Sequence, residues 1–455
     1  MMKAIQWTHH VISLAYMFFS WLLLSTDRTD FSQILILYSI LFGVYLVIIH
    51  FKKATFNYML NVVILTQLGA LLFMPQLSND MYRFLWDGAV TWMGENPMNS
   101  KPDGLMTDAA FNTSPYLKEL YRNMSDLSKR NYTCYPTVNQ FYFTAANTFS
   151  NSVWINNIVL KGLIAGTQIV GTIYFVKLLE HFSFKPYRVL ILIMNPLWMV
   201  ETAGNLHFEG VMFSFLIIAF YFLVKEKWLF GAIFIGLAIH VKLIPLVVLP
   251  FLFRYLGWKI SAFVYLMVGL VVTSLALIYL NESNVFNFIE SIALYFRAFE
   301  FNSFIFYHSL HYGYDYYGFY PVEKYALKLS RWSMFIITSL SVYGGFHDFK
   351  TMMKRMMFGL LIYILLSTTV HPWYILTLLG LSVFTNYSFG VVWSFLIFLS
   401  YAAYGPFSDP TIRNYVTLEY LVLFAALGIE LIRRKPIIPA YSFQDSLDSR
   451  SGTGS

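Results

Sequence analysis

Charged side chains are scarce in this sequence of 455 residues: Asp, Glu, Lys and Arg together make up 12%, about half of what a soluble domain carries. Hydrophobic residues make up 58%, and no aqueous fold hides so much apolar surface. They gather in long apolar runs of the kind that cross about 30 Å of hydrocarbon as helices, at residues 11–24, 34–49, 58–72, 158–179, 211–224, 262–280, 356–369 and 415–432. The sequence therefore predicts an all-α, polytopic transmembrane helical bundle.

Cysteine, phosphate-binding glycine loops and internal repeats are also lacking. The single Cys134 closes no internal disulfide and has no second cysteine for redox chemistry. No Gly-rich phosphate loop points to a nucleotide. The missing repeat counts against transporters built from duplicated halves.

Lysine and arginine give the chain a net charge of +7, and in a membrane protein their positions matter more than their sum, so nucleic acid is not indicated as a partner. They cluster in short gaps between apolar runs: Lys52 and Lys53; Lys177, Lys185 and Arg188; Lys225 and Lys227; Arg254 and Lys259; Lys350, Lys354 and Arg355; Arg433, Arg434 and Lys435. The positive-inside rule then places these gaps and both termini in the cytoplasm, with about 11 to 14 crossings. Residues 77–152 and 281–330 form two long segments on the opposite, outer face.

Residues 1–435 are expected to form one transmembrane domain, followed by a polar tail, 436–455. The end of that tail, Ser451 to Ser455, is typical of an added tag.

Proline and polar residues interrupt two of the apolar stretches. The stretch 228–255 is too long for one crossing and too short for two, and it carries His240, Lys242 and Pro245 near its middle. Because proline removes a backbone donor, we expect a broken helical hairpin whose tip reaches the outer side. Pro196 and Gly204 likewise interrupt 189–224.

The first outer segment begins with an acidic, aromatic stretch. On a helix Asp80, Arg83 and Asp87 share one face, so the arginine can orient either carboxylate. The alternative is an ordinary solvated ladder of ion pairs. Further along, helical spacing and mixed charge predict amphipathic helices on the membrane surface.

Ionisable residues recur where the outer ends of the helices are expected. Such groups are costly near the apolar slab and usually face a polar cavity, although each one alone also fits an interfacial or satisfied core position. Together, an acid suits a catalytic base, while the lysine, the arginine and the histidines suit a phosphate. The candidates are Glu201, His207, Glu209, His240, Lys242, Arg297 and His371.

Four motifs, in this order, resemble GT-C glycosyltransferases that use polyprenyl phosphate sugars. They are Asp80 to Gly88 with Gly94 to Pro97; Asn195 to Leu197 with Glu201, Gly204, Asn205, His207 and Glu209; Leu237 to Pro245; and His371, Pro372, Trp373 and Tyr374. The third is similar to a signature of the first GPI mannosyltransferase and its bacterial relatives. The resemblance spans most of the chain from the outer acidic segment onward.

The resemblance implies inverting transfer of a hexose, mannose by kinship, from a polyprenyl phosphate sugar to a hydroxyl at the outer face. The family's loop aspartate, a base or acceptor-orienting group, falls on Asp80. Substrate binding then falls to Arg83, Asp87, Glu201, His207, Glu209, His240, Lys242, Arg297, His371 and Tyr374. Asn79 precedes Asp80 where relatives have an acidic pair, which disfavours a metal and leaves the role of Asp87 open. No cofactor is expected, with a divalent cation as the alternative.

The sequence leaves the acceptor open among a lipid, a glycan and a protein. The expected location is the bacterial inner membrane, with the endoplasmic reticulum as the alternative. Two other classes share these features. A flippase or transporter of lipid-linked sugars predicts translocation without a covalent product, and a polysaccharide polymerase or ligase predicts a lipid diphosphate oligosaccharide donor.

Overall fold

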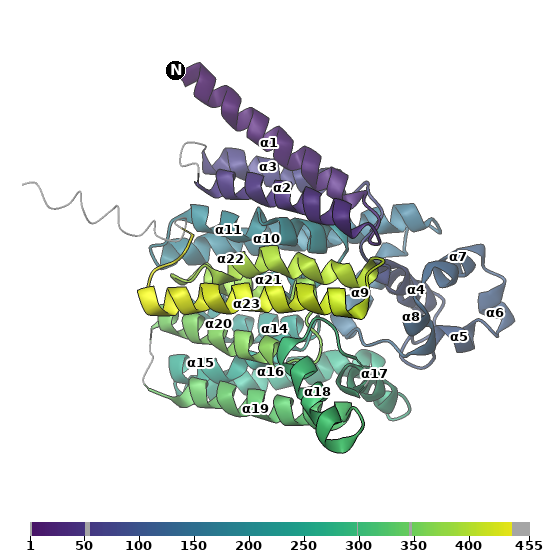
Figure 1. The fold of residues 1–455 in the computed structure, drawn as a ribbon. Coiled ribbons are helices and arrows are strands. Elements are labelled where there is room, and N and C mark those ends of the chain that lie inside the picture. Colours follow the sequence, from purple (N-terminus) through teal and green to yellow (C-terminus); the bar gives the residue numbers. More distant parts are fainter. Residues whose placement is uncertain (1, 51–54, 298, 345–347, 439–455) are drawn as a thin grey trace, which may run out of the picture.

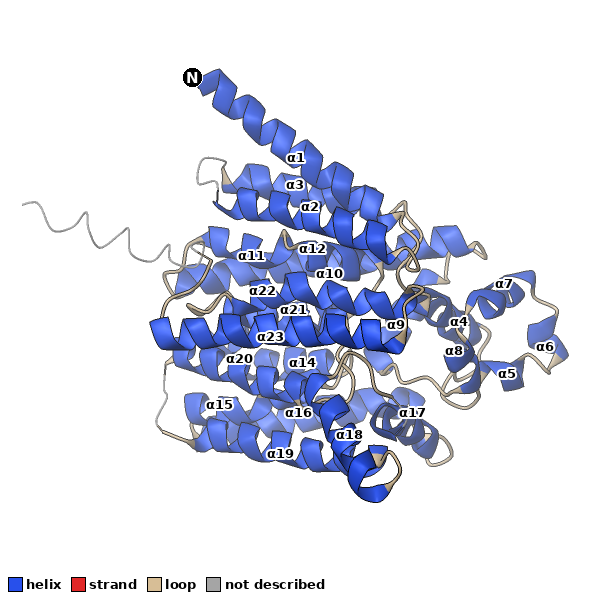
Figure 2. Cartoon of the chain, viewed as in Figure 1, coloured by secondary structure: helices blue, strands red, loops and turns tan. Residues whose placement is uncertain are grey.

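The computed structural model describes residues 2–50, 55–297, 299–344 and 348–438, with the side chains of 2–8 and 295–297 left out. This part of the chain is built of helices (Figures 1 and 2), and its β pairing is confined to an isolated bridge between Phe301 and Thr369. The expected all-α, polytopic helical fold is confirmed. Lys52, Lys53 and the tag-like Ser451 to Ser455 lie outside the described residues.

Long, roughly parallel and antiparallel helices form the body of the molecule (Figure 1). Their bounds are α1 (Met2–Leu24), α2 (Phe31–His50), α3 (Phe56–Ala70), α10 (Val153–His181), α13 (Glu209–Val224), α14 (Trp228–Ile239), α15 (Leu249–Leu256), α16 (Trp258–Tyr279), α19 (Val322–Val342), α20 (Phe349–Leu365), α21 (Ile375–Ser382), α22 (Phe389–Leu396) and α23 (Asp409–Arg433). Short pieces join them: η1 (Pro186–Val189), α11 (Leu190–Ile193), α12 (Pro196–Trp198), η2 (Met199–Gly204), η3 (Ile244–Val247), η4 (Pro372–Tyr374) and η5 (Ile397–Tyr404).

Four of the described helices, α2, α10, α16 and α23, are each long and apolar enough to cross a membrane. The pair Pro196–Gly204 and Glu209–Val224, bent by 109°, counts as a fifth if it forms one broken span. The protein is thus an integral membrane protein. The expected total of about 11 to 14 crossings stays a prediction, since the other crossings would use shorter or more polar helices.

Both predicted interruptions appear as breaks in the helices. In 228–255 the helix α14 ends at Ile239, a turn carries His240 and Lys242, and the chain resumes in η3 and α15. Pro245 lies at the start of η3, where its missing N–H costs nothing. The expected break is therefore confirmed, and the tip lies beside residues 77–152, as the site geometry below shows. That this side is the outer face stays a prediction.

The two long segments between crossings lie at one end of the bundle. The first contains α4 (Asp80–Trp92), α5 (Pro102–Leu105), α6 (Ala109–Asn112), α7 (Pro115–Asn123), α8 (Asp126–Arg130) and α9 (Thr137–Ala146); the second contains α17 (Val285–Arg297) and α18 (Phe304–Tyr317). Figure 1 shows that α1 begins, and α23 ends, at the opposite end of the bundle. Both ends of the described chain thus lie at the same end of the bundle, and their place in the cytoplasm stays a prediction.

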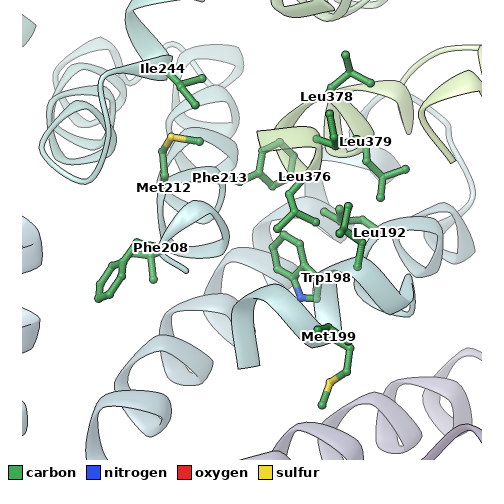
Figure 3. Close-up of a cluster of buried hydrophobic side chains, with 14 of the residues drawn as sticks. Leu192, Trp198, Met199, Phe208, Met212, Phe213, Ile244, Leu376, Leu378 and Leu379 are labelled. Carbon is green, nitrogen blue, oxygen red and sulfur yellow. The ribbon is translucent and has the colours of Figure 1, made fainter. Parts of the chain in front are cut away.

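The core beneath this outer segment is close-packed and largely apolar. Figure 3 shows Trp198 and Met199, next to the break before α13, together with Phe213 of α13 and Leu376 of α21. All four side chains are buried. Gly380 of α21 permits this packing, because a Cβ there would overlap with the Phe213 ring.

Helix α4 is fixed to α9 by a close backbone contact. A Cβ at Gly88 would overlap with the Phe143 carbonyl oxygen. Asn147, which follows α9, donates from Nδ2 to the carbonyls of Leu85 (3.1 Å) and Phe143 (2.8 Å). These contacts therefore fix α4 and α9 to each other within a folded segment.

We predict that Gly88→Ala separates α4 from α9 and destabilises the protein by about 1–3 kcal/mol, the usual cost of overpacking. The thermal unfolding midpoint in detergent measures this effect. Gly104→Ala in the same segment is the control, since nothing lies within 4 Å of a Cβ there. Equal midpoints for the two variants would contradict the close contact.

Candidate active site

A cavity of about 620 Å³ opens where the outer segment meets the bundle. Its walls come from the start of α4, the α1–α2 turn, the tip of the broken hairpin, the segment around η4 and the end of η5. Five of the predicted site residues line it: Asp80, His207, Lys242, His371 and Tyr374. Segments far apart in the sequence therefore meet around one space.

Asp80 is the first residue of α4, and its backbone N–H donates to Ser78 Oγ (3.3 Å). A carboxylate is favoured at a helix N-terminus by the orientation of the peptide dipoles. Burial nevertheless raises the pKa of Asp80 above its ordinary value, and the nearby positive charges of Lys242 and Arg28 oppose this shift. A carboxyl with a raised pKa is a better proton acceptor when ionised.

Lys242, at the hairpin tip, forms an ion pair with Glu209, the first residue of α13. Glu209 is fully buried, whereas 20% of the Lys242 side chain is exposed. The ammonium also lies over the rings of Trp373 (5.9 Å) and Tyr374 (5.7 Å). The pair joins the two broken helices and leaves further ammonium hydrogens toward the cavity.

Three aromatic rings stack along another wall. The ring of Trp373 lies 3.5 Å from that of His207 and 4.3 Å from that of His371, with interplanar angles of 24° and 14°. His371 is held from behind by Phe301, which accepts a hydrogen bond from Val370 N–H (2.9 Å). The stack thus fixes two histidines from separate motifs, His207 and His371, against the Trp373 ring.

Several buried polar atoms of the site make no hydrogen bond to any described residue: Glu209 Oε2, His207 Nε2 and His371 Nδ1. Glu201 Oε2 is 3.5 Å from His207 Nε2, without hydrogen-bond geometry. Buried polar groups normally have partners, because an unsatisfied one costs about 1–3 kcal/mol. His207 and His371 both line the cavity, so these nitrogens are available to a polar group in it.

Glu201 stands behind the cavity rather than in its lining. Its carboxylate accepts hydrogen bonds from Tyr401 Oη (2.8 Å) and Asn205 Nδ2 (3.3 Å). Tyr401 itself lines the cavity. Glu201 is thus placed to position other groups.

Other predicted site residues lie outside the lining. Arg83 pairs with Asp87 (2.7 Å) and donates to the Asn131 carbonyl (2.9 Å), while Gln140 Nε2 donates to Asp87 (3.3 Å). This pair is buried, so the solvated ladder considered above is not what forms. His240 is 2.8 Å from the Val272 carbonyl. Arg297 ends α17, and its side chain lies outside the described residues.

The sequence analysis missed some lining residues. Arg28, in the α1–α2 turn, and Tyr404 of η5 form a cation–π contact at 5.2 Å and lie on the cavity wall. One feature of the sequence could have indicated Arg28. It is a basic residue in a turn on the side of the membrane where the charge pattern predicts few basic residues. Tyr404 had none, because it lies far along the chain from the motifs.

No group of three or more His, Cys, Asp or Glu side chains suited to a metal occurs in the described part of the chain. The expectation that the protein needs no cofactor stays a prediction.

Comparison with known proteins adds a family. Residues 2–257 match the family described as alpha-(1->6)-mannopyranosyltransferase, N-terminal domain. Alpha-(1->6)-mannopyranosyltransferase A of Corynebacterium glutamicum is 24% identical over 180 residues, which cover 39% of this chain and 34% of that relative. The match therefore spans about a third of the relative's length. No solved structure matches the chain.

The ion pair at the hairpin tip generates a stability prediction. Lys242→Met should destabilise the protein, because Glu209 stays buried without its partner; a fully buried pair costs about 3–5 kcal/mol to break, and a partly exposed lysine less. Adding Glu209→Gln should restore much of the loss, which thermal unfolding measures. A double variant as unstable as the sum of the single variants would contradict the pairing.

Proposed function

Because this chain belongs to the alpha-(1->6)-mannopyranosyltransferase family, we propose that it transfers a mannosyl residue from a polyprenyl phosphate mannose to a hydroxyl group of an acceptor. The observation that carries the proposal is the cavity in which the Asp80 carboxylate lies near Lys242 and Arg28. A base and cations in one partly apolar space are what transfer from a lipid phosphate requires.

Asp80 is the general base in this proposal. It takes the proton of the acceptor hydroxyl while that oxygen attacks C1 of the sugar. The bond between C1 and the phosphate oxygen breaks, and the polyprenyl phosphate leaves with the electron pair. Attack opposite to the leaving group inverts C1, so an α-linked product requires a β-linked donor.

Lys242 and His371 stabilise the departing phosphate. Lys242 has ammonium hydrogens beyond the one engaged by Glu209, and His371 Nδ1 has no hydrogen-bond partner among the described residues. Since the leaving group is already a phosphate, it needs charge stabilisation more than protonation. In this proposal His207 lines the sugar side of the cavity, and Glu201 acts from behind it through its hydrogen bond to Tyr401.

The lipid part of the donor has a matching surface beside Lys242. Leu243 and Leu246 line the cavity and are 42% and 46% exposed. A polyprenyl chain gains about 0.8 kcal/mol for each buried CH₂ group. These exposed leucines thus support a donor whose phosphate lies in the cavity while its polyprenyl chain stays in the membrane.

We place this reaction on the outer face of the membrane, with both termini in the cytoplasm. The walls of the cavity include α4 and α8, which lie at one end of the bundle. The helix α20 begins beside Lys350, and α23 ends at Arg433, at the opposite end (Figure 1). The positive-inside rule assigns the basic end to the cytoplasm.

For the acceptor we propose a mannose 6-hydroxyl of a glycan, since the family and its corynebacterial relative carry the α-(1→6) linkage in their names.

One assay separates the alternative functions. Purified protein is incubated with one of two donors, polyprenyl phosphate mannose or a lipid diphosphate oligosaccharide. Each donor is combined with a glycan, a lipid or a peptide acceptor, and each reaction is run with and without a chelator. A product from the second donor alone indicates a polymerase, and translocation without a product indicates a transporter.

Asp80→Asn should lower turnover by about a hundredfold to ten-thousandfold, the usual worth of general base catalysis, while donor binding and the unfolding midpoint stay near those of the parent protein. Asparagine keeps the size of aspartate but accepts no proton. Asp87→Asn is the comparison, because Asp87 pairs with Arg83 away from the cavity; its loss should fall mainly on stability. Normal turnover in the Asp80→Asn variant would show that Asp80 is not the general base.

The pH dependence of kcat/KM should report the ionisation of Asp80. Only the carboxylate acts as base, so activity is lost as pH falls through its pKa, which burial holds above the ordinary value of 3.8. Because Arg28 lowers this pKa, Arg28→Gln should move the acidic limb to higher pH, and Arg28→Lys should leave it nearly in place. A limb that is unchanged or moved to lower pH in Arg28→Gln would contradict the assignment.

A further inference from the structure

A second cavity has a volume of about 540 Å³ and is lined by the start of α20 and the end of α23. These helix ends lie at the end of the bundle opposite to α4 (Figure 1). The first turns of α20 line it with Lys350, Thr351 and Lys354, and Arg434 lines it just after α23. The segment after α21 adds Thr385 and Asn386. Three cations thus surround a hollow that also offers hydroxyl and amide groups.

Aromatic rings rather than acids accompany the two lysines. The ammonium of Lys350 lies 4.6 Å from the centre of the Phe184 ring, and that of Lys354 lies 5.4 Å from the centre of the Tyr387 ring. No carboxylate of the described residues forms an ion pair with Lys350, Lys354 or Arg434. A cation–π contact holds a lysine in place but leaves its charge uncompensated.

The acidic residues nearest to these cations in the sequence accept hydrogen bonds from backbone N–H groups. Asp348 accepts from Thr351 N–H (2.9 Å) and caps α20. Glu430 is buried and accepts from the N–H groups of Phe389 (3.1 Å) and Ile437 (2.8 Å). Behind the wall, the buried Arg188 donates to the Thr385 carbonyl (2.5 Å) and adds a further positive charge. The cavity is therefore electropositive.

Apolar surface continues from this cavity along α23. Leu431 lines the cavity, and the neighbouring Ile432 is 84% exposed. Leu418, Leu421 and Ile429 are also exposed, at spacings that bring them to the side of Ile432 on the helix. A ligand that fits both surfaces has an anionic head and hydrocarbon chains.

We propose that this cavity binds the headgroup of an anionic phospholipid, with the phosphate among Lys350, Lys354 and Arg434 and the acyl chains along α23. The adjoining apolar stripe favours a lipid over a free phosphate, which would gain nothing from it. The uncompensated charge favours a lipid of net negative charge over a zwitterionic one.

Binding of three ligands to the purified full-length chain in a neutral detergent tests the proposal: phosphatidylglycerol, phosphatidylcholine and inorganic phosphate, measured by native mass spectrometry with thermal unfolding alongside. The parent protein should bind phosphatidylglycerol in preference to the other two. Lys350→Gln with Lys354→Gln should weaken that binding by about tenfold or more, as expected for lost charge-assisted contacts.

The matched control is Lys225→Gln with Lys227→Gln, which removes two charges from the exposed α13–α14 turn outside the cavity and should leave binding unchanged. If the first double variant does not fold, Arg434→Asn replaces it, because asparagine tolerates the left-handed backbone (φ 53°) at this position. Equal binding of phosphatidylcholine, equal losses in both double variants, or inorganic phosphate as the preferred ligand would each overturn the proposal.

Discussion

Polar and charged groups buried in an apolar bundle must find partners within the protein, because hydrocarbon offers none. Two buried charges meet this requirement at helix ends. Lys161 of α10 donates to the carbonyls of Ala70 (3.0 Å) and Phe73 (2.7 Å), where α3 ends. Glu430 of α23 accepts from the N–H groups of Ser388 (3.0 Å) and Phe389 (3.1 Å), where α22 begins. Each charge satisfies backbone groups that an interrupted helix leaves open, so short and broken helices become tolerable.

The candidate active site depends on the same constraint. The chain bends by 109° before α13 and breaks again after α14, which brings acidic and basic side chains to the breaks. The ion pair of Lys242 with Glu209 links these two breaks. Because each partner compensates the other, both charges persist beside the cavity. A continuous pair of apolar helices would offer no place for a polar substrate here.

Local spacing predicted much of this arrangement, since a helical period places Asp80, Arg83 and Asp87 on one face and Pro245 marks a break. The spacing did not predict that Arg83 would form its ion pair with Asp87 rather than with Asp80. That pairing depends on the Asn131 carbonyl and on Gln140, both distant in the sequence. Arg28 and Tyr404 reach the cavity from the α1–α2 turn and η5. Contacts between such remote segments leave no periodic pattern in either segment.

The two cavities differ in how their charges are balanced, and this difference bears on what each can bind. At the Asp80 cavity, the carboxylates of Asp80 and Glu209 accompany the cations of Lys242 and Arg28. An anion bound there would meet a nearly compensated field, which suits the turnover that we propose for this site. At the α20–α23 cavity the cations have no carboxylate partners among the described residues. A cavity lined by charges of one sign raises the local concentration of an oppositely charged ligand. The second cavity therefore suits the anionic headgroup that we propose for it, and the first suits the catalysis that we propose there.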